Sequence, residues 1–142
     1  MLSCDSVTFK IFPPQWDCLV SPGGCGLIFD IHGAAMNAET QNRGSKIRRH
    51  GNNAGYIVVN PQQPASYWVP SRDHPRIVSF LREIIVSYAV EPSRVHVTGF
   101  SQGAFATWNI LCLASDVVCS AAPLCSSGLD PWSAVRQPST PF

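Results

Sequence analysis

The chain has 142 residues, a formal net charge of +1, and a composition that is 45% hydrophobic and only 13% charged. Disordered segments show the opposite balance, so we expect residues 1–142 to form a single packed domain. The near-neutral charge and the lack of a basic stripe argue against a nucleic-acid partner, and no apolar run approaches the roughly 20 residues that span a bilayer.

The first third of the chain predicts two strands and a helix. Residues 7–12 form a candidate strand, followed by proline-rich turns. Residues 26–31 are a short apolar run bounded by glycine, which is typical of a strand buried on both faces in a parallel sheet. The polar stretch 37–53 contains few helix breakers before Gly51, so we expect one surface helix there.

The middle of the chain predicts strand, loop, helix and strand. Residues 56–59 form a second strong strand, and a loop rich in Gln, Pro, Tyr and Trp runs through Pro70. Apolar residues then recur at helical spacing from Ile77 to Tyr88, and Asp73 and Pro75 supply helix start signals. Pro92 closes this helix, and residues 94–98 begin a third strand.

The last third predicts a buried helix and a short strand. Residues 104–113 are apolar on nearly every side, as expected for a helix packed against a sheet. Residues 120–124 form a candidate fourth strand, and 126–142 are loop-like. Because strands alternate with helices, the fold class is α/β, with a mostly parallel sheet and flanking helices.

The six cysteines favour disulfides over a metal site. No Cys-x-x-Cys pair occurs and the four histidines are scattered, so no metal is expected. Cys18 and Cys25 flank a Ser-Pro-Gly-Gly turn and are the best candidate pair; buried free thiols are the alternative. Disulfides place a protein in an oxidising compartment, so we expect an extracellular protein whose signal peptide is not visible in this sequence.

The segment Gly99-Phe100-Ser101-Gln102-Gly103 matches the Gly-x-Ser-x-Gly pattern of a nucleophile elbow. The string alone is weak evidence, but here it follows a predicted strand and opens a predicted helix, which is the setting that the motif requires. A helix start presents free backbone N–H groups to a negative charge. Ser101 is therefore the predicted nucleophile, and the Gln102 N–H is a predicted oxyanion donor.

A second oxyanion donor is expected from the loop after the strand 26–31. Gly33 allows this loop to bend toward the serine, leaving the N–H of Ala34 or Ala35 to face the site. We interpret His32 as a structural residue of the loop rather than as the catalytic base. Tyr67 and Trp68, on the loop after the second strand, are candidates for lining a substrate pocket, with loop packing as the alternative role.

These segments resemble the polyhydroxybutyrate depolymerase and feruloyl esterase group of α/β-hydrolases. The resemblance rests on residues 25–33, 55–61 and 90–103, and the Pro-x-Arg-Val lead into the elbow strand is its most specific part. It implies an α/β-hydrolase-type sheet, Ser101 as nucleophile, and an oxyanion hole made by the His32-Gly33 loop and Gln102. It implies no cofactor.

The resemblance also implies hydrolysis of carboxylic esters through a serine acyl-enzyme. The implied substrate, small or polymeric, is of the polyester (polyhydroxyalkanoate) or the feruloyl or acetyl ester type; a thioesterase or lipase-like relative would share the same parts. Such enzymes carry the triad in the order Ser, Asp, His. Here no histidine follows Ser101, and the only acidic residues that follow it are Asp116 and Asp130.

Asp130 is interpreted as a turn residue, and none of the histidines before Ser101 is well placed to act as the base. We therefore expect a partial hydrolase domain that ends before the triad acid and base and lacks the C-terminal strands of the sheet. Such a chain alone would be nearly inactive. The alternative is a catalytically incomplete or non-enzymatic hydrolase-like domain.

Overall fold

The computed structural model describes residues 2–4 and 7–126, which form six strands and four helices. In chain order the elements are β1 (Leu2–Cys4), β2 (Val7–Phe12), β3 (Cys25–Ile31), α1 (Ala38–Ser45), α2 (Ile47–Asn53), β4 (Tyr56–Gln62), α3 (Pro70–Ser87), β5 (Val90–Phe100), α4 (Gln102–Leu113) and β6 (Ser120–Leu124). The predicted loop 126–142 lies almost entirely outside the described residues.

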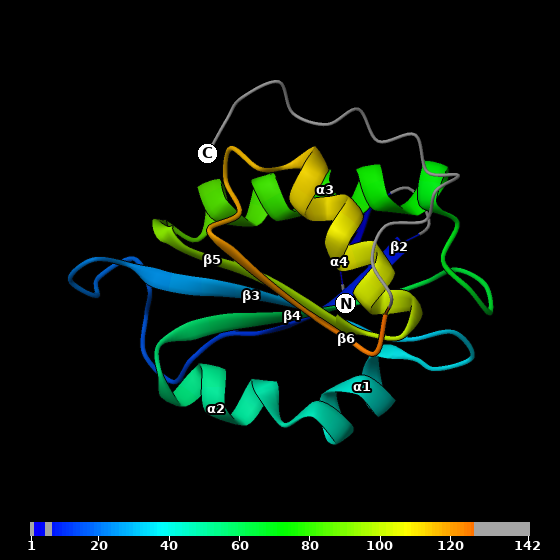
Figure 1. Ribbon diagram of the computed structural model, residues 1–142. Coiled ribbons are helices and arrows are strands. Elements are labelled where there is room, and N and C mark those ends of the chain that lie inside the picture. Colours follow the sequence, from blue (N-terminus) through cyan, green and yellow to red (C-terminus); the bar gives the residue numbers. More distant parts are fainter. Residues whose placement is uncertain (1, 5–6, 127–142) are drawn as a thin grey trace.

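All six strands join one sheet in the order β1-β2-β4-β3-β5-β6. Strands β4, β3, β5 and β6 run parallel to one another, whereas β2 pairs antiparallel with β4, and β1 antiparallel with β2. Helices α1 and α2 cover one face of the sheet and α3 and α4 cover the other (Figure 1). The predicted α/β class, with a mostly parallel sheet and flanking helices, is confirmed.

Strand β3 pairs with β4 on one side and β5 on the other, and it carries an apolar row of side chains on one face and Asp30 on the opposite face. Leu27, Phe29 and Ile31 are fully buried, as expected for a parallel strand that is covered by helices on both sides. On the side of α3, the ring of Phe9 from β2 stacks on Phe80 with centroids 3.7 Å apart. This packing holds the antiparallel edge of the sheet against the helical layer.

The single helix predicted over residues 37–53 is in fact two. Helix α1 ends and α2 begins at Lys46, which has a φ of 61°. This left-handed conformation interrupts the helical hydrogen bonds, and it is unfavourable for a lysine, so the residue type gives no warning of the break.

Helix α3 begins earlier than its start signals suggested. Pro70 occupies the first turn, where a proline is tolerated because its missing N–H needs no partner. Pro75 lies inside the helix instead of at its start. The Asp73 carboxylate reaches back and accepts the Val69 N–H at 2.8 Å, so it satisfies the backbone just ahead of the helix.

The predicted Cys18–Cys25 disulfide is present and closes the turn that leads into β3. Cys112, Cys119 and Cys125 are free thiols, so the expectation of disulfides is wrong for these three. The side chain of Cys4 lies outside the described residues. No helix in the described part of the chain is long and apolar enough to cross a membrane.

Candidate active site

Ser101 lies between the end of β5 and the start of α4 and has φ 53° and ψ −115°. A positive φ is strained for any residue with a Cβ, and such strain persists only where the surroundings impose it. Here the Ser101 N–H donates to the Leu124 carbonyl at 2.9 Å, and the Ser101 carbonyl accepts the N–H groups of Ala104 and Phe105 at 3.0 and 3.2 Å. These bonds fix the turn and leave the serine side chain exposed.

Gly99 and Gly103 allow the elbow to pack directly on the end of β3. A Cβ on Gly103 would clash with the Ile31 carbonyl oxygen and lie 2.7 Å from that of His32. A Cβ on Gly99 would lie 2.9 Å from the Ile31 oxygen. For Gly103 the atoms in the way belong to the backbone of β3 and of the residue after it, whereas a Cβ on Gly99 would first meet the backbone of Gly103 across the turn. Gly103 therefore allows the elbow to approach β3 closely, and Gly99 allows the turn itself to close.

The loop after β3 reaches the nucleophile at Gly33. A Cβ on Gly33 would lie 3.2 Å from the Phe100 carbonyl oxygen and 3.3 Å from the Ser101 Cβ. The structure thus brings together the two segments that the sequence assigned to the oxyanion hole.

His32 holds this loop through its backbone neighbours. Its Nδ1–H donates to the Gly33 carbonyl at 2.8 Å, and its Nε2 accepts the Gln63 N–H at 3.4 Å. Burial lowers the pKa of the imidazole, which keeps it in the neutral form that this pair of bonds requires. Both ring nitrogens are engaged, in keeping with the structural role expected for His32.

The three predicted oxyanion donors differ in whether their backbone N–H already has a hydrogen-bond acceptor. The Gln102 N–H is at the first position of α4, where no carbonyl within the helix can accept it. Among the described residues the Ala34 N–H also has no acceptor. The Ala35 N–H, however, donates to the Ser66 carbonyl at 2.9 Å. Of the two alanines offered by the sequence, Ala34 is therefore the available donor, and Ala35 is committed to the loop after β4.

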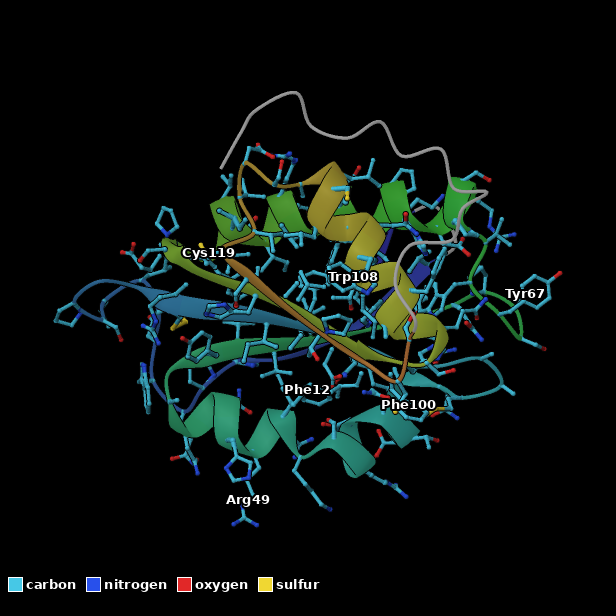
Figure 2. All side chains as sticks on the ribbon, viewed as in Figure 1. Phe12, Arg49, Tyr67, Phe100, Trp108 and Cys119 are labelled. Carbon is cyan, nitrogen blue, oxygen red and sulfur yellow. A yellow bond between two sulfur atoms is a disulfide. The ribbon has the colours of Figure 1, made fainter. Side chains whose placement is uncertain are left out.

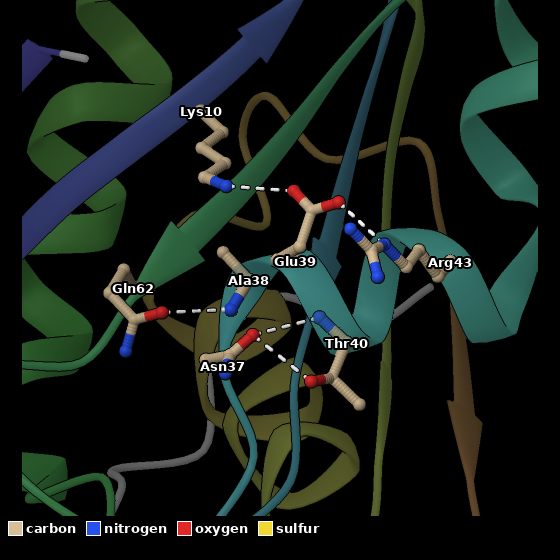
Figure 3. A network of polar contacts seen from close by, with 7 residues as sticks. All are labelled: Lys10, Asn37, Ala38, Glu39, Thr40, Arg43 and Gln62. Carbon is tan, nitrogen blue, oxygen red and sulfur yellow. Dashed lines mark hydrogen bonds and ion pairs between the residues drawn. The ribbon is translucent and has the colours of Figure 1, made fainter.

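Helix α1 anchors the far end of the loop after β3 (Figure 3). Asn37 caps the helix by accepting the Thr40 N–H at 2.8 Å, and the Ala38 N–H donates to the Gln62 side chain on β4 at 2.8 Å. Glu39 forms an ion pair with Lys10 on β2 at 2.8 Å. Residues 33–36 are consequently held between β3 on one side and a helix tied to two strands on the other.

Asp30 adds a buried polar link that sequence reasoning missed. Its carboxylate, 1% exposed, accepts the Gln41 amide at 2.7 Å and the Ser45 hydroxyl at 2.7 Å, both from α1. Burial raises the pKa of Asp30, although these bonds oppose the effect. The signal in the sequence was a lone acidic residue within the apolar run of β3, because buried carboxylates need such partners.

Tyr67 and Trp68 have different surroundings. Trp68 is 1% exposed, and its indole N–H donates to the His32 carbonyl at 2.8 Å. For Trp68 this geometry favours loop packing over pocket lining. Tyr67 is 57% exposed and extends outward from the loop (Figure 2). Phe100, next to Ser101, is a further exposed aromatic residue that was not singled out from the sequence.

None of the four histidines, all in the described part of the chain, hydrogen-bonds Ser101. His74 is buried within α3, and His50 is exposed on α2. His96, on β5, is half-buried, and its ring nitrogens lie 2.8 Å from the Ser120 hydroxyl and 3.3 Å from the Tyr56 hydroxyl. The base therefore has no visible candidate beside the nucleophile.

The acids after Ser101 give no candidate either. Asp116 forms a two-bond ion pair with Arg82, at 2.7 and 2.8 Å, and Asp130 lies outside the described residues. Within the described ranges, no three His, Cys, Asp or Glu side chains are grouped to hold a metal ion.

A cavity of about 410 Å³ lies beside α2, on the face of the sheet away from α3 and α4. Its lining includes His50, Tyr56, His96 and Ser120, but not Ser101. This cavity is not the candidate reaction site. The strained Ser101 and the N–H groups without acceptors lie elsewhere, at the carboxyl edge of the sheet.

Known proteins share the fold of this chain. No protein-family model matches the chain. Poly(3-hydroxyalkanoate) depolymerase C of Paucimonas lemoignei is 29% identical over 117 residues, covering 72% of this chain and 28% of the depolymerase. Among solved structures, acetyl xylan esterase from Aspergillus awamori has a TM-score of 0.72 and 20% identity, covering 81% of this chain and 45% of the esterase.

Est1E from Butyrivibrio proteoclasticus, solved with ferulic acid, superposes with a TM-score of 0.68 and 15% identity, covering 85% of this chain and 50% of Est1E. At these identities the two structures establish the fold. The chain spans half or less of the length of each of these proteins. In fold and in sequence, the chain resembles the polyhydroxybutyrate depolymerase and feruloyl esterase group of α/β-hydrolases.

Proposed function

We propose that this chain is the nucleophile-bearing part of a serine carboxylic ester hydrolase. The observation that carries the proposal is the strained Ser101, with the available N–H groups of Gln102 and Ala34 on the two segments beside it. Free N–H groups that flank a strained nucleophile suit a reaction in which negative charge develops on a carbonyl oxygen.

In the proposed reaction the Ser101 Oγ attacks the ester carbonyl carbon while its proton passes to a general base. The carbonyl oxygen becomes an oxyanion and accepts the N–H groups of Gln102 and Ala34. The bond to the alcohol then breaks, the base returns the proton to the departing oxygen, and an acyl ester remains on Ser101. Water, deprotonated by the same base, attacks the acyl ester, and the bond to the Ser101 Oγ breaks. The base returns the proton to that Oγ, and the acid is released.

The proposed substrates are polyesters of hydroxyalkanoate type or feruloyl and acetyl esters. Support comes from the similarity to a poly(3-hydroxyalkanoate) depolymerase and from the shared fold with an acetyl xylan esterase. The exposed ring of Phe100, next to Ser101, provides apolar surface for an acyl or aromatic group, and Tyr67 is a second exposed ring on the loop after β4. The Cys18–Cys25 disulfide supports a secreted protein.

A second candidate is a hydrolase-like domain that does not catalyse on its own. The placement of the histidines favours it, because none of the four hydrogen-bonds Ser101 in the described part of the chain. Without a base, a serine hydroxyl is a poor nucleophile at neutral pH.

Hydrolysis of p-nitrophenyl butyrate by two forms of the protein separates the candidates. In the protein expressed from its complete reading frame, Ser101→Ala should lower kcat by a factor on the order of 10⁶, as for the nucleophile of other serine hydrolases. Residues 1–142 alone should differ little from their own Ser101→Ala variant. Imidazole, added as an external base, should raise turnover by residues 1–142 but not by that variant.

Hydrolysis by the complete protein that survives Ser101→Ala would overturn the proposal. Full turnover by residues 1–142 without imidazole would instead identify one of the four upstream histidines as the base. No Ser101-dependent turnover in either form would favour the non-catalytic domain. Oligomers of 3-hydroxybutyrate, methyl ferulate and acetylated xylan, assayed in parallel, would then rank the substrate classes.

A further inference from the structure

The side chain of Gln102 forms two hydrogen bonds with the backbone of one residue, Trp68. Its Oε1 accepts the Trp68 N–H at 2.9 Å, and its Nε2 donates to the Trp68 carbonyl at 3.1 Å. Gln102, whose backbone N–H is a proposed oxyanion donor, thus uses its side-chain carboxamide to hold the loop after β4. A carboxamide carries the same donor and acceptor as a peptide group, so it pairs with the backbone as a neighbouring strand would.

Further bonds join the same loop to the segment after β3. The Trp68 indole N–H donates to the His32 carbonyl at 2.8 Å, and the rings of these two residues lie 5.0 Å apart. The Ser66 carbonyl accepts the Ala35 N–H at 2.9 Å. The loop is therefore bonded to both segments of the candidate oxyanion hole, and Gln102 provides the bonds on the elbow side.

Between these anchors the chain is open to solvent. Residues 64–67 are exposed, whereas Trp68 is buried. Tyr67 precedes the residue that Gln102 holds, so the position of its outward-pointing ring depends on that attachment. An exposed loop samples many conformations unless such bonds restrict it.

We propose that the Gln102 carboxamide is a positioning residue that holds the loop carrying Tyr67 against the elbow, so that Tyr67 contacts the bulky acyl or aromatic part of an ester bound at Ser101. This inference rests on the proposed ester hydrolase function. It assigns specificity for large ester groups to a side chain that is itself removed from the reacting atoms.

The test uses the protein expressed from its complete reading frame with Gln102→Met, which keeps the length of the side chain and loses both hydrogen bonds. Gln15→Met, at an exposed glutamine, is the matched control. Amide hydrogen exchange of residues 63–69 should accelerate about tenfold in Gln102→Met, as expected for the loss of two neutral hydrogen bonds. The control should exchange like the wild type.

Steady-state kinetics provide the second measurement. In Gln102→Met, KM for methyl ferulate should rise roughly five- to tenfold more than KM for p-nitrophenyl acetate, so the measured quantity is the ratio of the two KM changes. Tyr67→Ala should produce the same selective rise. Because both changes act on one contact, the double variant should show much less than the product of the two effects.

Equal losses for both esters, accompanied by a lower Tm, would mean that Gln102 only stabilises the fold and would overturn the inference. Unchanged exchange in residues 63–69, or fully multiplicative effects of Gln102→Met and Tyr67→Ala, would overturn it too. If the proposed function itself is wrong, the wild type will show no Ser101-dependent hydrolysis of either ester. The specificity assigned to Gln102 would then also be wrong, whatever the hydrogen-exchange data show.

Discussion

Gly103 is the residue at which the elbow touches the end of β3. The carbonyl oxygens of Ile31 and His32 occupy the space where a side chain on Gly103 would begin. Both belong to the backbone next to the proposed oxyanion donor Ala34. The spacing between nucleophile and donor is therefore set by the absence of one methyl group.

Gly103→Ala should reduce both catalysis and stability. The added Cβ would force the elbow and the loop after β3 apart, and a displacement of ~1 Å costs about 100-fold in rate. Overpacking of this kind costs about 1–3 kcal/mol of unfolding free energy. The check is kcat/KM for p-nitrophenyl butyrate in the complete protein, together with its urea midpoint. A variant with wild-type kcat/KM would show that this contact does not set the donor geometry.

At the scale of elements, α1 is short for a helix that positions a loop of the site. It has eight residues, and isolated helices of that length are not stable in water. Asn37 caps its first turn, and the contacts of Ala38 and Glu39 hold it against β4 and β2. Toward its last turn Gly44 contributes no side chain, and a Cβ there would meet nothing within 4 Å.

Gly44→Ala should stabilise the domain by about 0.5–1 kcal/mol, because alanine restricts the unfolded chain and adds no clash in the helix. Urea unfolding should show a higher midpoint with an unchanged m-value. Gly44→Ala is also the matched comparison for Gly103→Ala, since the same methyl group is added in open space. A lower midpoint would mean that Gly44 does not have the helical conformation described.

The sequence predicts some of these features better than others, for physical reasons. The buried strand β3 and the elbow were predicted because their signals are local: an apolar run, and glycines around a serine. The break at Lys46 was missed because a left-handed backbone at a lysine leaves no mark in the residue type. Which alanine has a free N–H depends on Ser66, a partner in a distant loop.

For the whole molecule, three histidines affect how stability depends on pH. Burial lowers the pKa values of His32, His74 and His96, and that of His74 falls from 6.5 to about 4. A histidine whose pKa is lower in the folded state favours folding when it is neutral. Its contribution is fully present above pH 6.5, the ordinary pKa of histidine, and is lost as the pH falls toward 4.

The urea-unfolding free energy should therefore fall between pH 6.5 and pH 4, with about 3 kcal/mol of the loss due to His74. In His74→Leu most of that part should disappear, because leucine does not titrate. His50→Gln, at an exposed histidine, should retain the wild-type pH dependence. The raised pKa of Asp30 acts in the opposite direction, so the difference between wild type and His74→Leu is the decisive quantity. Parallel pH curves for those two proteins would contradict the assignment.

The pairing of β3 with β5 has a consequence for how the chain folds. Ile31 is in register with Gly99, although α1, α2, β4 and α3 all lie between them in the sequence. Closing so long a segment of chain is slow, because its entropy is lost before the contact forms. A folding intermediate that has formed only local structure holds Ser101 without Gly33 beside it. The proposed site is therefore complete only once this long-range pairing has formed.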